Sequence, residues 1–214
     1  QGPLLAVACG GCLIRSGGFK LEAIEEWLNR VRLERATHVI TVPTVWSLIE
    51  RYASHHDYFD APECRFLISV AAQLAPDLWQ RLETRFHRTL FNEYGLTETV
   101  ASALYAGPHP EMGEFDTIGK PVDCAARLDP AAIDDGIGEL QLRGDNIFMG
   151  YWKNPERTQE VFTDDGWLRT GDLVRSLPSG AFAICGRIKS IINSGGLLIR
   201  PEEIDEVIKQ LPQV

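Results

Sequence analysis

Positive charge is scarce in this sequence. Its 214 residues carry 21 Lys and Arg against 30 Asp and Glu, which gives a formal net charge of −9 at pH 7. The basic residues are scattered along the chain, whereas binding to a phosphate backbone requires them in clusters. We therefore expect no nucleic-acid partner.

Long apolar runs are missing as well. A membrane-spanning helix needs about 20 consecutive apolar residues, and no stretch of the chain approaches that length. The first residues, QGPLLAVACGG, lack the positively charged start of a secretory signal peptide and contain no initiator Met. We expect no membrane span, a cytoplasmic location, and a chain that is a segment of a longer protein.

Cysteine is sparse, with five residues at Cys9, Cys12, Cys64, Cys124 and Cys185. An odd number at irregular spacing argues against a disulfide framework and for reduced thiols. The first two form a CxxC pair, but a zinc site needs a second pair of ligands and a redox motif needs a thioredoxin-like context. We expect these thiols to be buried and inert.

Helical and strand patterns alternate through the first half of the chain. Apolar residues recur at helical spacing over 20–34, and the β-branched strand HVITV follows at 38–42. Pro43 and Pro76 each suit the first position of a helix, and the strands FLISV and TLFNEY flank the second of these helices. This alternation predicts a parallel α/β lobe, in which ligands lie beyond the carboxyl ends of the strands.

Short strands between Gly-rich and Pro-rich turns follow residue 106. GELQLRG at 138–144 and GAFAICG at 180–186 alternate in character, which predicts half-buried antiparallel strands. The last segment resembles a hairpin followed by a helix that begins at Pro201. We predict an α/β fold in three parts: an α/β lobe over 1–115, a β-barrel-like subdomain over 116–187, and the start of a small α+β lid domain over 188–214.

Three motifs contain residues suited to a nucleotide. In YGLTE at 94–98, a hydroxyl and a carboxylate follow a strand, where they suit phosphate and Mg²⁺, or else form an ordinary turn with a solvated Glu98. In DGWLRTGD at 165–172, a TGD turn delivers Asp172, which suits the hydroxyls of a ribose or simply caps a hairpin. In GRIKSIINSGGLLIRPEEID at 186–205, Arg187 and Lys189 suit phosphate or ribose, or else protect a strand edge.

These motifs, in this order and together with GELQLRG and MGYWKNPE, resemble the core motifs of the adenylate-forming superfamily of acyl-CoA synthetases, amino-acid adenylation domains and firefly luciferase. The resemblance covers essentially the whole chain, and INSGGLLIRPEEID resembles the CoA ligases most. It implies an acid-thiol ligase that uses ATP, Mg²⁺ and coenzyme A. In that reaction a carboxylate attacks the α-phosphorus of ATP, pyrophosphate leaves, and a thiol then takes the acyl group from the acyl adenylate and releases AMP.

The resemblance also implies roles for individual residues. Asn92 would contact the adenine amino group, Tyr94 would stack on the adenine ring, and Thr97 would hold the α-phosphate as a catalytic residue. Glu98 would be the second catalytic residue and the Mg²⁺ ligand, while Asp172 and Arg187 would bind the ribose. The acid pocket would include Ser69, Val70, Ala71, Ala72 and Gly95, and CoA would pass Gly195 and Gly196.

Parts of the family's site have no counterpart in the sequence. It lacks the Ser-, Thr- and Gly-rich phosphate loop and the catalytic lysine near the family's C-terminus, and Val70 and Ala71 stand where glycines are usual. We therefore expect a ligase as the parent protein, acting on a fatty or aryl acid, and an inactive isolated chain. The alternatives are a nucleotide-binding pseudoenzyme, an interaction module, or an adenylation domain that serves a carrier protein; the oligomeric state is open.

Overall fold

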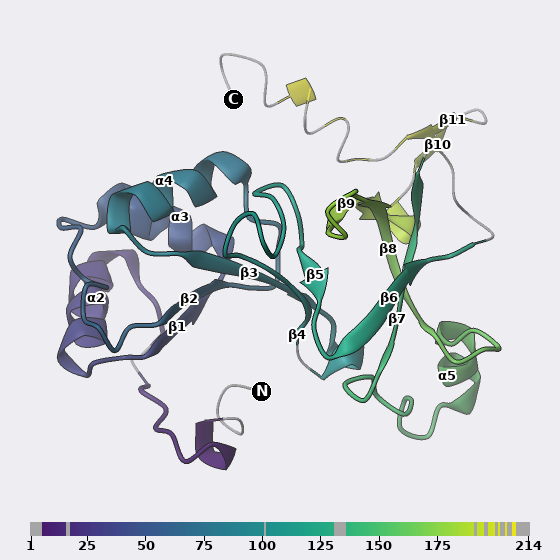
Figure 1. The fold of residues 1–214 in the computed structure, drawn as a ribbon, viewed down its shortest axis with the longest axis horizontal. Coiled ribbons are helices and arrows are strands. Elements are labelled where there is room, and N and C mark those ends of the chain that lie inside the picture. The colour runs from purple at the N-terminus through teal and green to yellow at the C-terminus, as the bar shows by residue number, and fades with distance from the viewer. Residues whose placement is uncertain are drawn as a thin grey trace.

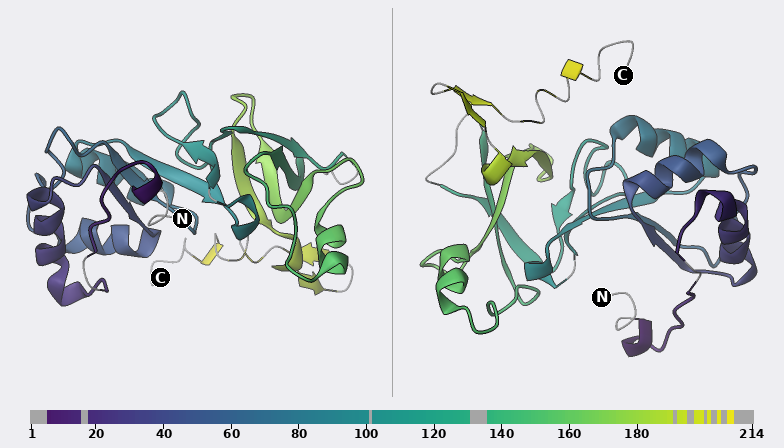
Figure 2. Two further views of the ribbon diagram at one scale, coloured as in Figure 1. Left: turned by 90° about the horizontal axis from the view of Figure 1, so that it is seen from below. Right: turned by 180° about the vertical axis from the view of Figure 1, so that it is seen from behind.

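The computed structural model describes residues 6–15, 18–100, 102–130, 136–190, 192–194 and 197–199, together with residues 201, 204, 207 and 208. Two main sheets organise these residues, and Figure 1 shows them on opposite sides of the molecule. Helices cover the sheet formed by the earlier part of the chain, whereas the later sheet consists of antiparallel strands (Figure 2). The predicted fold, a parallel α/β lobe followed by antiparallel β structure, is confirmed.

The first sheet has five strands in the order β1-β2-β3-β4-β5. The first three strands are parallel, while β4 and β5 join in antiparallel pairing. The change of direction follows the carboxyl end of β3, where the YGLTE motif lies. The strands are β1 (His38–Thr41), β2 (Phe66–Ser69), β3 (Leu90–Gly95), β4 (Ser102–Ala106) and β5 (Lys120–Pro121).

Three α-helices pack on this sheet: α2 (Ile24–Leu33), which follows the 3₁₀ turn η1 (Leu21–Ala23), α3 (Pro43–Tyr52) and α4 (Pro76–Phe86). Both prolines occupy the helix start, as predicted, because that position needs no N–H partner. Indole N–H groups of Trp46 and Trp79 donate to the main-chain oxygens of Ile68 (3.2 Å) and Leu90 (3.1 Å), which ties α3 and α4 to the strands. The helices and strands share one apolar core that includes Leu28, Trp46, Ile49, Trp79, Val39, Leu67 and Leu90.

The second sheet has four antiparallel strands in the order β6-β7-β8-β9. These are β6 (Cys124–Leu128), β7 (Ile137–Gly144), β8 (Leu168–Ser176) and β9 (Phe182–Arg187), and α5 (Pro155–Val161) precedes β8. GELQLRG lies in an antiparallel strand, as predicted, but the expectation that this strand is half-buried is wrong. The polar residues Glu139 and Gln141 are also buried, at 7% and 1% exposure. A layer of polar contacts, rather than solvent, covers that face of β7.

The two sheets are joined through Gly119, directly before β5. Phe182 of β9 donates its N–H to the Gly119 oxygen (3.0 Å), and its own oxygen accepts the N–H of Ile118 (2.8 Å). A Cβ on Gly119 would lie 1.8 Å from the Tyr105 oxygen, and φ is +77°, so only glycine fits this close crossing. Leu104 and Ile118 also enter the core of the second sheet. These contacts fix β3 of one sheet relative to β8 and β9 of the other.

The chain after β9 continues through the 3₁₀ turn η3 (Ile188–Ser190) into an antiparallel pair, β10 (Ile192–Ser194) and β11 (Leu197–Ile199). Gly195 and Gly196, predicted to line the path of CoA, lie outside the described residues. The division into three parts at 115/116 and 187/188 remains a prediction.

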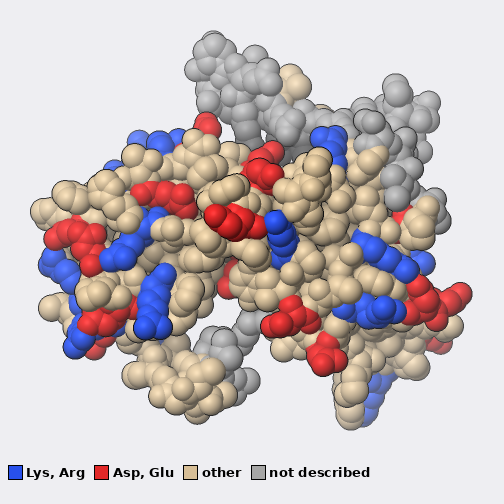
Figure 3. All heavy atoms as spheres, in the orientation of Figure 1, with Lys and Arg blue, Asp and Glu red and all other residues tan. Residues whose placement is uncertain are grey.

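The surface mixes charges of both signs, and red and blue side chains alternate over the face shown in Figure 3. Cys9 and Cys12 are exposed, so the expectation that they are buried is wrong, although Cys64 is buried. The CxxC pair precedes helix α2, outside the apolar core of the α/β lobe. Among the described residues, no helix is both long enough and apolar enough to cross a membrane.

Candidate functional site

Three of the predicted ribose and adenine residues meet where β3, β8 and β9 converge. Tyr94 at the end of β3 donates its hydroxyl hydrogen to Asp172 Oδ2 (2.6 Å), across 78 residues of sequence. Arg187 at the end of β9 donates Nε–H to Asp172 Oδ1 (2.5 Å). Asp172 is 4% exposed. The structure therefore brings these residues into one cluster, and their roles toward a nucleotide remain predictions.

Asp172 lies within a continuous strand, so the predicted TGD turn is wrong. β8 runs from Leu168 to Ser176, and its pairing with β7 shifts between Glu139↔Leu173 and Gln141↔Arg169. The segment 170–172 therefore lies opposite Leu140 alone, as a β-bulge. Gly171 has φ +74°, a conformation that glycine adopts without strain. Bulges change the direction of side chains, and this one directs Asp172 toward Tyr94 and Arg187.

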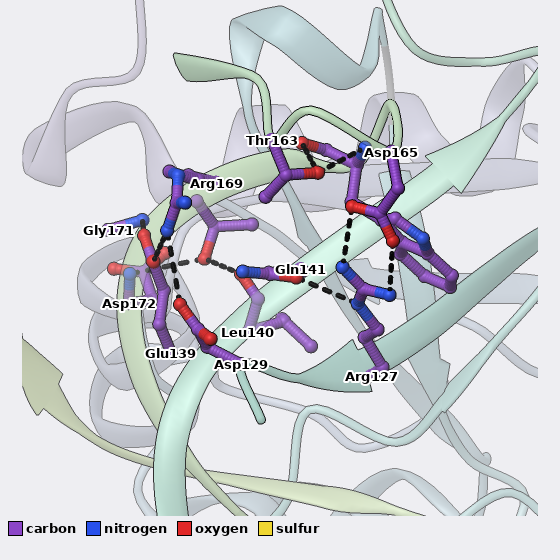
Figure 4. A network of polar contacts seen from close by, with 12 residues as sticks. Arg127, Asp129, Glu139, Leu140, Gln141, Thr163, Asp165, Arg169, Gly171 and Asp172 are labelled. Atoms are coloured by element: carbon purple, nitrogen blue, oxygen red, sulfur yellow. Dashed lines mark hydrogen bonds and ion pairs between the residues drawn. The ribbon is translucent and has the colours of Figure 1, made fainter. Parts of the chain in front are cut away.

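Buried polar contacts hold the bulge in place (Figure 4). Glu139 Oε1 accepts the N–H of Gly171 (2.9 Å). The Thr170 hydroxyl donates to the Leu140 oxygen (2.7 Å) and accepts the N–H of Asp172 (3.1 Å). The N–H groups of Gly171 and Asp172 and the oxygen of Leu140 thus have side-chain partners in place of ladder hydrogen bonds, as buried polar groups require.

A second set of contacts fixes the DGW turn before β8 (Figure 4). Arg127 of β6 forms a two-pronged ion pair with Asp165 (2.7 and 3.0 Å) and donates Nε–H to Gln141 Oε1 (2.8 Å). Its guanidinium also lies 4.3 Å from the ring centre of Trp167. The hydrogen bond from Arg127 lowers the pKa of Asp165 to about 2. Gln141, which the alternating pattern placed in solvent, is buried because it joins this network.

Burial and the charges of the cluster keep Tyr94 protonated, so that it acts as a neutral hydrogen-bond donor to Asp172. Burial, reinforced by the Asp172 charge and hydrogen bond, raises the pKa of Tyr94. The hydrogen bond to Asp172 likewise raises the pKa of the Arg187 guanidinium. A carboxylate oxygen can accept two hydrogen bonds, and the described residues give Asp172 one donor on each oxygen, so two acceptor positions are left. A vicinal diol supplies such a pair of donors.

Glu98 is held by a residue without a predicted role. It lies in the 3₁₀ turn η2 (Thr97–Thr99) that follows β3, and its Oε1 accepts the hydroxyl hydrogen of Tyr151 (2.5 Å). That hydrogen bond raises the pKa of Tyr151. Thr97, the other predicted catalytic residue, is exposed beside Glu98.

The donor set around Glu98 fits a magnesium ion that is carried largely by a substrate. Among the described residues, no group of three or more His, Cys, Asp or Glu could hold a metal ion. Mg²⁺ usually takes one or two protein carboxylates and completes its shell with water and substrate phosphates. A single carboxylate at the end of a strand is therefore sufficient for a metal–nucleotide complex and too little for a resident metal.

Ser69 and Asn92 are paired neighbours on β2 and β3. They are 0% and 3% exposed, and among the described residues neither Ser69 Oγ nor Asn92 Oδ1 has a hydrogen-bond partner. The Asn92 amide nitrogen donates weakly to the Thr117 oxygen (3.5 Å). An unpaired buried acceptor costs free energy, about 1–3 kcal/mol, until a donor reaches it.

The remaining residues predicted for the acid pocket lie around the carboxyl ends of β2 and β3. Val70 is partly buried, whereas Ala71, Ala72 and Gly95 are exposed. Ala71 has φ +72°, the left-handed conformation that glycine favours. Two surface hollows, of about 490 Å³ beside α3 and α4 and about 590 Å³ lined by residues 149–162, do not include them. The acid pocket therefore remains a prediction.

Tyr151 and Glu139 are the site residues that sequence reasoning missed. Both belong to motifs that were recognised, MGYWKNPE and GELQLRG, but each acts on a residue more than 30 positions away, on Glu98 and Gly171. The sequence did contain an indication of Glu139. It lies in a strand with Leu140 and Leu142, and a polar residue in such a strand can be buried as well as exposed to solvent. No comparable local signal pointed to Tyr151.

Comparison with known proteins gives a consistent result. The model of the family described as AMP-binding enzyme matches residues 2–152. Sulfoacetate–CoA ligase from Cupriavidus necator is 36% identical over 210 residues, covering 96% of this chain and 40% of the relative. Oxalate–CoA ligase from Arabidopsis thaliana is 33% identical, covering 100% of this chain and 42% of the relative. The chain thus spans about two fifths of these relatives.

Solved structures agree with this picture. ATP-bound MatB from Rhodopseudomonas palustris superposes with a TM-score of 0.82 at 27% identity, over 99% of this chain and 42% of that protein. The o-succinylbenzoate CoA synthetase MenE from Bacillus subtilis, in complex with an acyl-adenylate intermediate, superposes with a TM-score of 0.85 over 100% of this chain and 43% of that protein. Its 21% identity supports the shared fold alone.

Proposed function

Because the chain belongs to the family of AMP-binding enzymes, we propose that the whole protein is an ATP-dependent carboxylic acid:CoA ligase. The substrate carboxylate attacks the α-phosphorus of ATP, a P–O bond to pyrophosphate breaks, and an acyl adenylate forms. The thiol of CoA then attacks the acyl carbon, loses its proton, and releases AMP. The names of the sulfoacetate and oxalate relatives support this reaction class.

The cluster of Tyr94, Asp172 and Arg187 is the observation that carries the proposal. Its acceptor is a buried carboxylate with two lone-pair positions to spare, which suits the 2′- and 3′-hydroxyls of a ribose. The Tyr94 hydroxyl is already engaged with Asp172, so the ring is held and its face can stack on adenine. Arg187 keeps a positive charge beside the ribose and the α-phosphate.

Asn92 and Thr97 complete the nucleotide side of the proposed site. The unpaired Oδ1 of Asn92 is an acceptor, which suits the exocyclic amino group of adenine. The exposed Thr97 hydroxyl, one residue before Glu98, suits an oxygen of the α-phosphate. The chain itself supplies no nucleophile in this reaction, so its residues act by positioning the substrates and stabilising charge.

Glu98 would hold Mg²⁺ bound to the phosphates of ATP. When bound, the ion neutralises negative charge that develops on the phosphates and the leaving pyrophosphate. The carboxylate contributes one fixed ligand and keeps the metal–nucleotide complex at the end of β3. Its restraint by Tyr151 supports this role, because a fixed ligand loses less entropy on binding.

The partners that follow from this proposal are ATP, CoA and a small carboxylic acid. The five cysteines are all described and form no disulfide, which fits a reducing, cytoplasmic location. Relatives include enzymes named for sulfoacetate, oxalate, salicylate and 4-hydroxybutyrate, so the acid is best found with a panel that contains these. A carrier protein as acyl acceptor is tested by replacing CoA with a phosphopantetheinylated carrier.

The test is to incubate the whole protein with ATP, Mg²⁺, CoA and each acid and to measure AMP, pyrophosphate and acyl-CoA. We expect AMP and acyl-CoA in equal amounts with at least one acid, and none without ATP. ADP in place of AMP, or no product with any acid, would refute the proposal. The 214 residues alone should bind AMP without catalysing pyrophosphate exchange.

A further inference from the structure

We propose that Tyr151 is a positioning residue that holds the Glu98 carboxylate in the orientation needed to bind the metal ion of a metal–nucleotide complex. This inference rests on the proposed function and deepens it. It gives a role to the MGYWKNPE segment, which otherwise lies outside the cluster around Asp172.

The segment holds Glu98 at both its side chain and its main chain. The Tyr151 hydroxyl donates to Oε1 at 2.5 Å, and the N–H of Phe148 donates to the Glu98 main-chain oxygen at 2.8 Å. Glu98 needs such support because η2 is a single 3₁₀ turn of three residues, which offers few contacts of its own. Without the hydroxyl, the carboxylate of Glu98 can rotate about its side-chain bonds.

Tyr151 is in turn fixed by helix α5. Its N–H donates to Thr158 Oγ1 (2.9 Å), and the Thr158 hydroxyl donates to the Asn154 oxygen (2.9 Å). The preceding Gly150 has φ +145°, and a Cβ there would lie 2.6 Å from Thr158 Cγ2. The ring of Tyr151 also packs edge-on against Phe148, with centroids 4.9 Å apart. The loop and α5 therefore form a rigid support behind the hydroxyl.

The geometry leaves one oxygen of Glu98 for the ion. Oε1 is taken by Tyr151, and within the described parts of the chain no hydrogen bond to Oε2 is present. A neutral hydroxyl donor orients the carboxylate without cancelling its charge, whereas a lysine or arginine in that place would compete with the cation. Oε2 would therefore be the oxygen of Glu98 that holds the ion, with water and substrate phosphates supplying the other ligands.

The experiment compares Tyr151→Phe with wild type in the whole protein, using α,β-methylene-ATP as the probe. Its dissociation constant is measured by calorimetry in the presence of Mg²⁺ and in EDTA. Mg²⁺ should tighten binding by a factor that is about 5- to 10-fold smaller in Tyr151→Phe than in wild type, which corresponds to the net contribution of one ordinary hydrogen bond. Binding in EDTA should change little. A merely structural role would weaken binding equally in both buffers.

Tyr58→Phe is the matched control. Tyr58 also donates its hydroxyl hydrogen to a glutamate, Glu25, but this pair links the loop after α3 to α2. The control should leave the effect of Mg²⁺ unchanged. As a second variant, Thr158→Val keeps the Tyr151 hydroxyl and removes its support, and it should shift the Mg²⁺ effect in the same direction by a smaller factor.

An unchanged Mg²⁺ effect in Tyr151→Phe, or an equal loss in EDTA, would overturn the inference while leaving the proposed function intact. Failure of the wild-type protein to bind the ATP analogue in either buffer would instead overturn the proposed function and the inference with it. The two failures are therefore distinguishable within one set of titrations.

Discussion

Replacing Asp172 tests the cluster on which the proposed function depends. The buried carboxylate accepts hydrogen bonds from Tyr94 and Arg187 at 2.6 and 2.5 Å. Asp172→Asn keeps the shape of the side chain and one acceptor oxygen for Arg187. The Tyr94 hydroxyl, which donates to Asp172, would then have to accept a hydrogen bond from the Asn amide group. Asp172→Ala removes both acceptors.

The loss of stability in each variant depends on which hydrogen-bond partner of Asp172 is left buried without an acceptor. Arg187 is 57% exposed, so its charge stays hydrated when the carboxylate is lost and contributes little to the change. The Tyr94 hydroxyl faces the interior of the cluster, and the loss of a hydrogen bond to a charged acceptor costs about 1.5–3 kcal/mol. We expect Asp172→Ala to lower the free energy of unfolding by about 2 kcal/mol and Asp172→Asn by about 1 kcal/mol.

Measurements of nucleotide affinity decide whether Asp172 contacts the ribose or only stabilises the fold. In the whole protein, AMP should bind about 10-fold more weakly to Asp172→Asn and about 100-fold more weakly to Asp172→Ala, as measured by calorimetry. With 2′,3′-dideoxy-AMP, which has no hydroxyls to donate, both variants should lose much less affinity relative to wild type than they do with AMP. An equal loss with AMP and with the dideoxy analogue would refute a direct contact between Asp172 and the ribose.

Three further predictions concern stability, each measured by thermal or urea unfolding. Ala71→Gly should raise the free energy of unfolding by about 0.5–1 kcal/mol, because φ is +72° and glycine removes the strain of the Cβ; a lower stability would contradict this. Glu139→Ala should cost about 1–3 kcal/mol by leaving the Gly171 N–H unpaired, whereas Glu139→Gln keeps an acceptor oxygen and should lose clearly less; equal losses would refute the role of that bond. The Asp165 pKa is lowered in the folded state, so its stabilisation is present above the unfolded value near 3.9 and is lost as the pH falls toward about 2. The difference in Tm between wild type and Asp165→Asn should therefore narrow over that range, and a constant difference would contradict the ion pair with Arg127.

Local patterns were enough to predict the α/β lobe. Helix periods, β-branched strands and the two prolines at helix starts each depend on a few neighbouring residues, and α3 and α4 begin at Pro43 and Pro76 as predicted. The parallel order of β1, β2 and β3 follows from the alternation of strands and helices. The position of YGLTE at the carboxyl end of β3 was correct for the same reason.

The β-bulge in β8 could not be predicted, because it depends on the partner strand. Thr, Gly and Asp favour turns on their own, so TGD was interpreted as a turn. Only the pairing of β8 with β7, and the carboxylate of Glu139 placed to accept the Gly171 N–H, make the segment continue as a strand. The burial of Glu139 and Gln141 follows from the same contacts.

The two carboxylates with proposed roles share a feature that no local pattern contains. Asp172 and Glu98 each accept a hydrogen bond from a tyrosine hydroxyl, from Tyr94 and Tyr151, at separations of 78 and 53 residues. A tyrosine can orient a carboxylate while leaving its charge intact, which a site needs when that charge must later meet a cation or a pair of hydroxyls. The motifs predict which residues would contact the nucleotide, but the fold decides which residues hold them, because sheet pairing and the crossing at Gly119 bring those partners together. Substitutions at the supporting tyrosines should therefore change how the carboxylates bind without removing a single group that touches the reacting atoms.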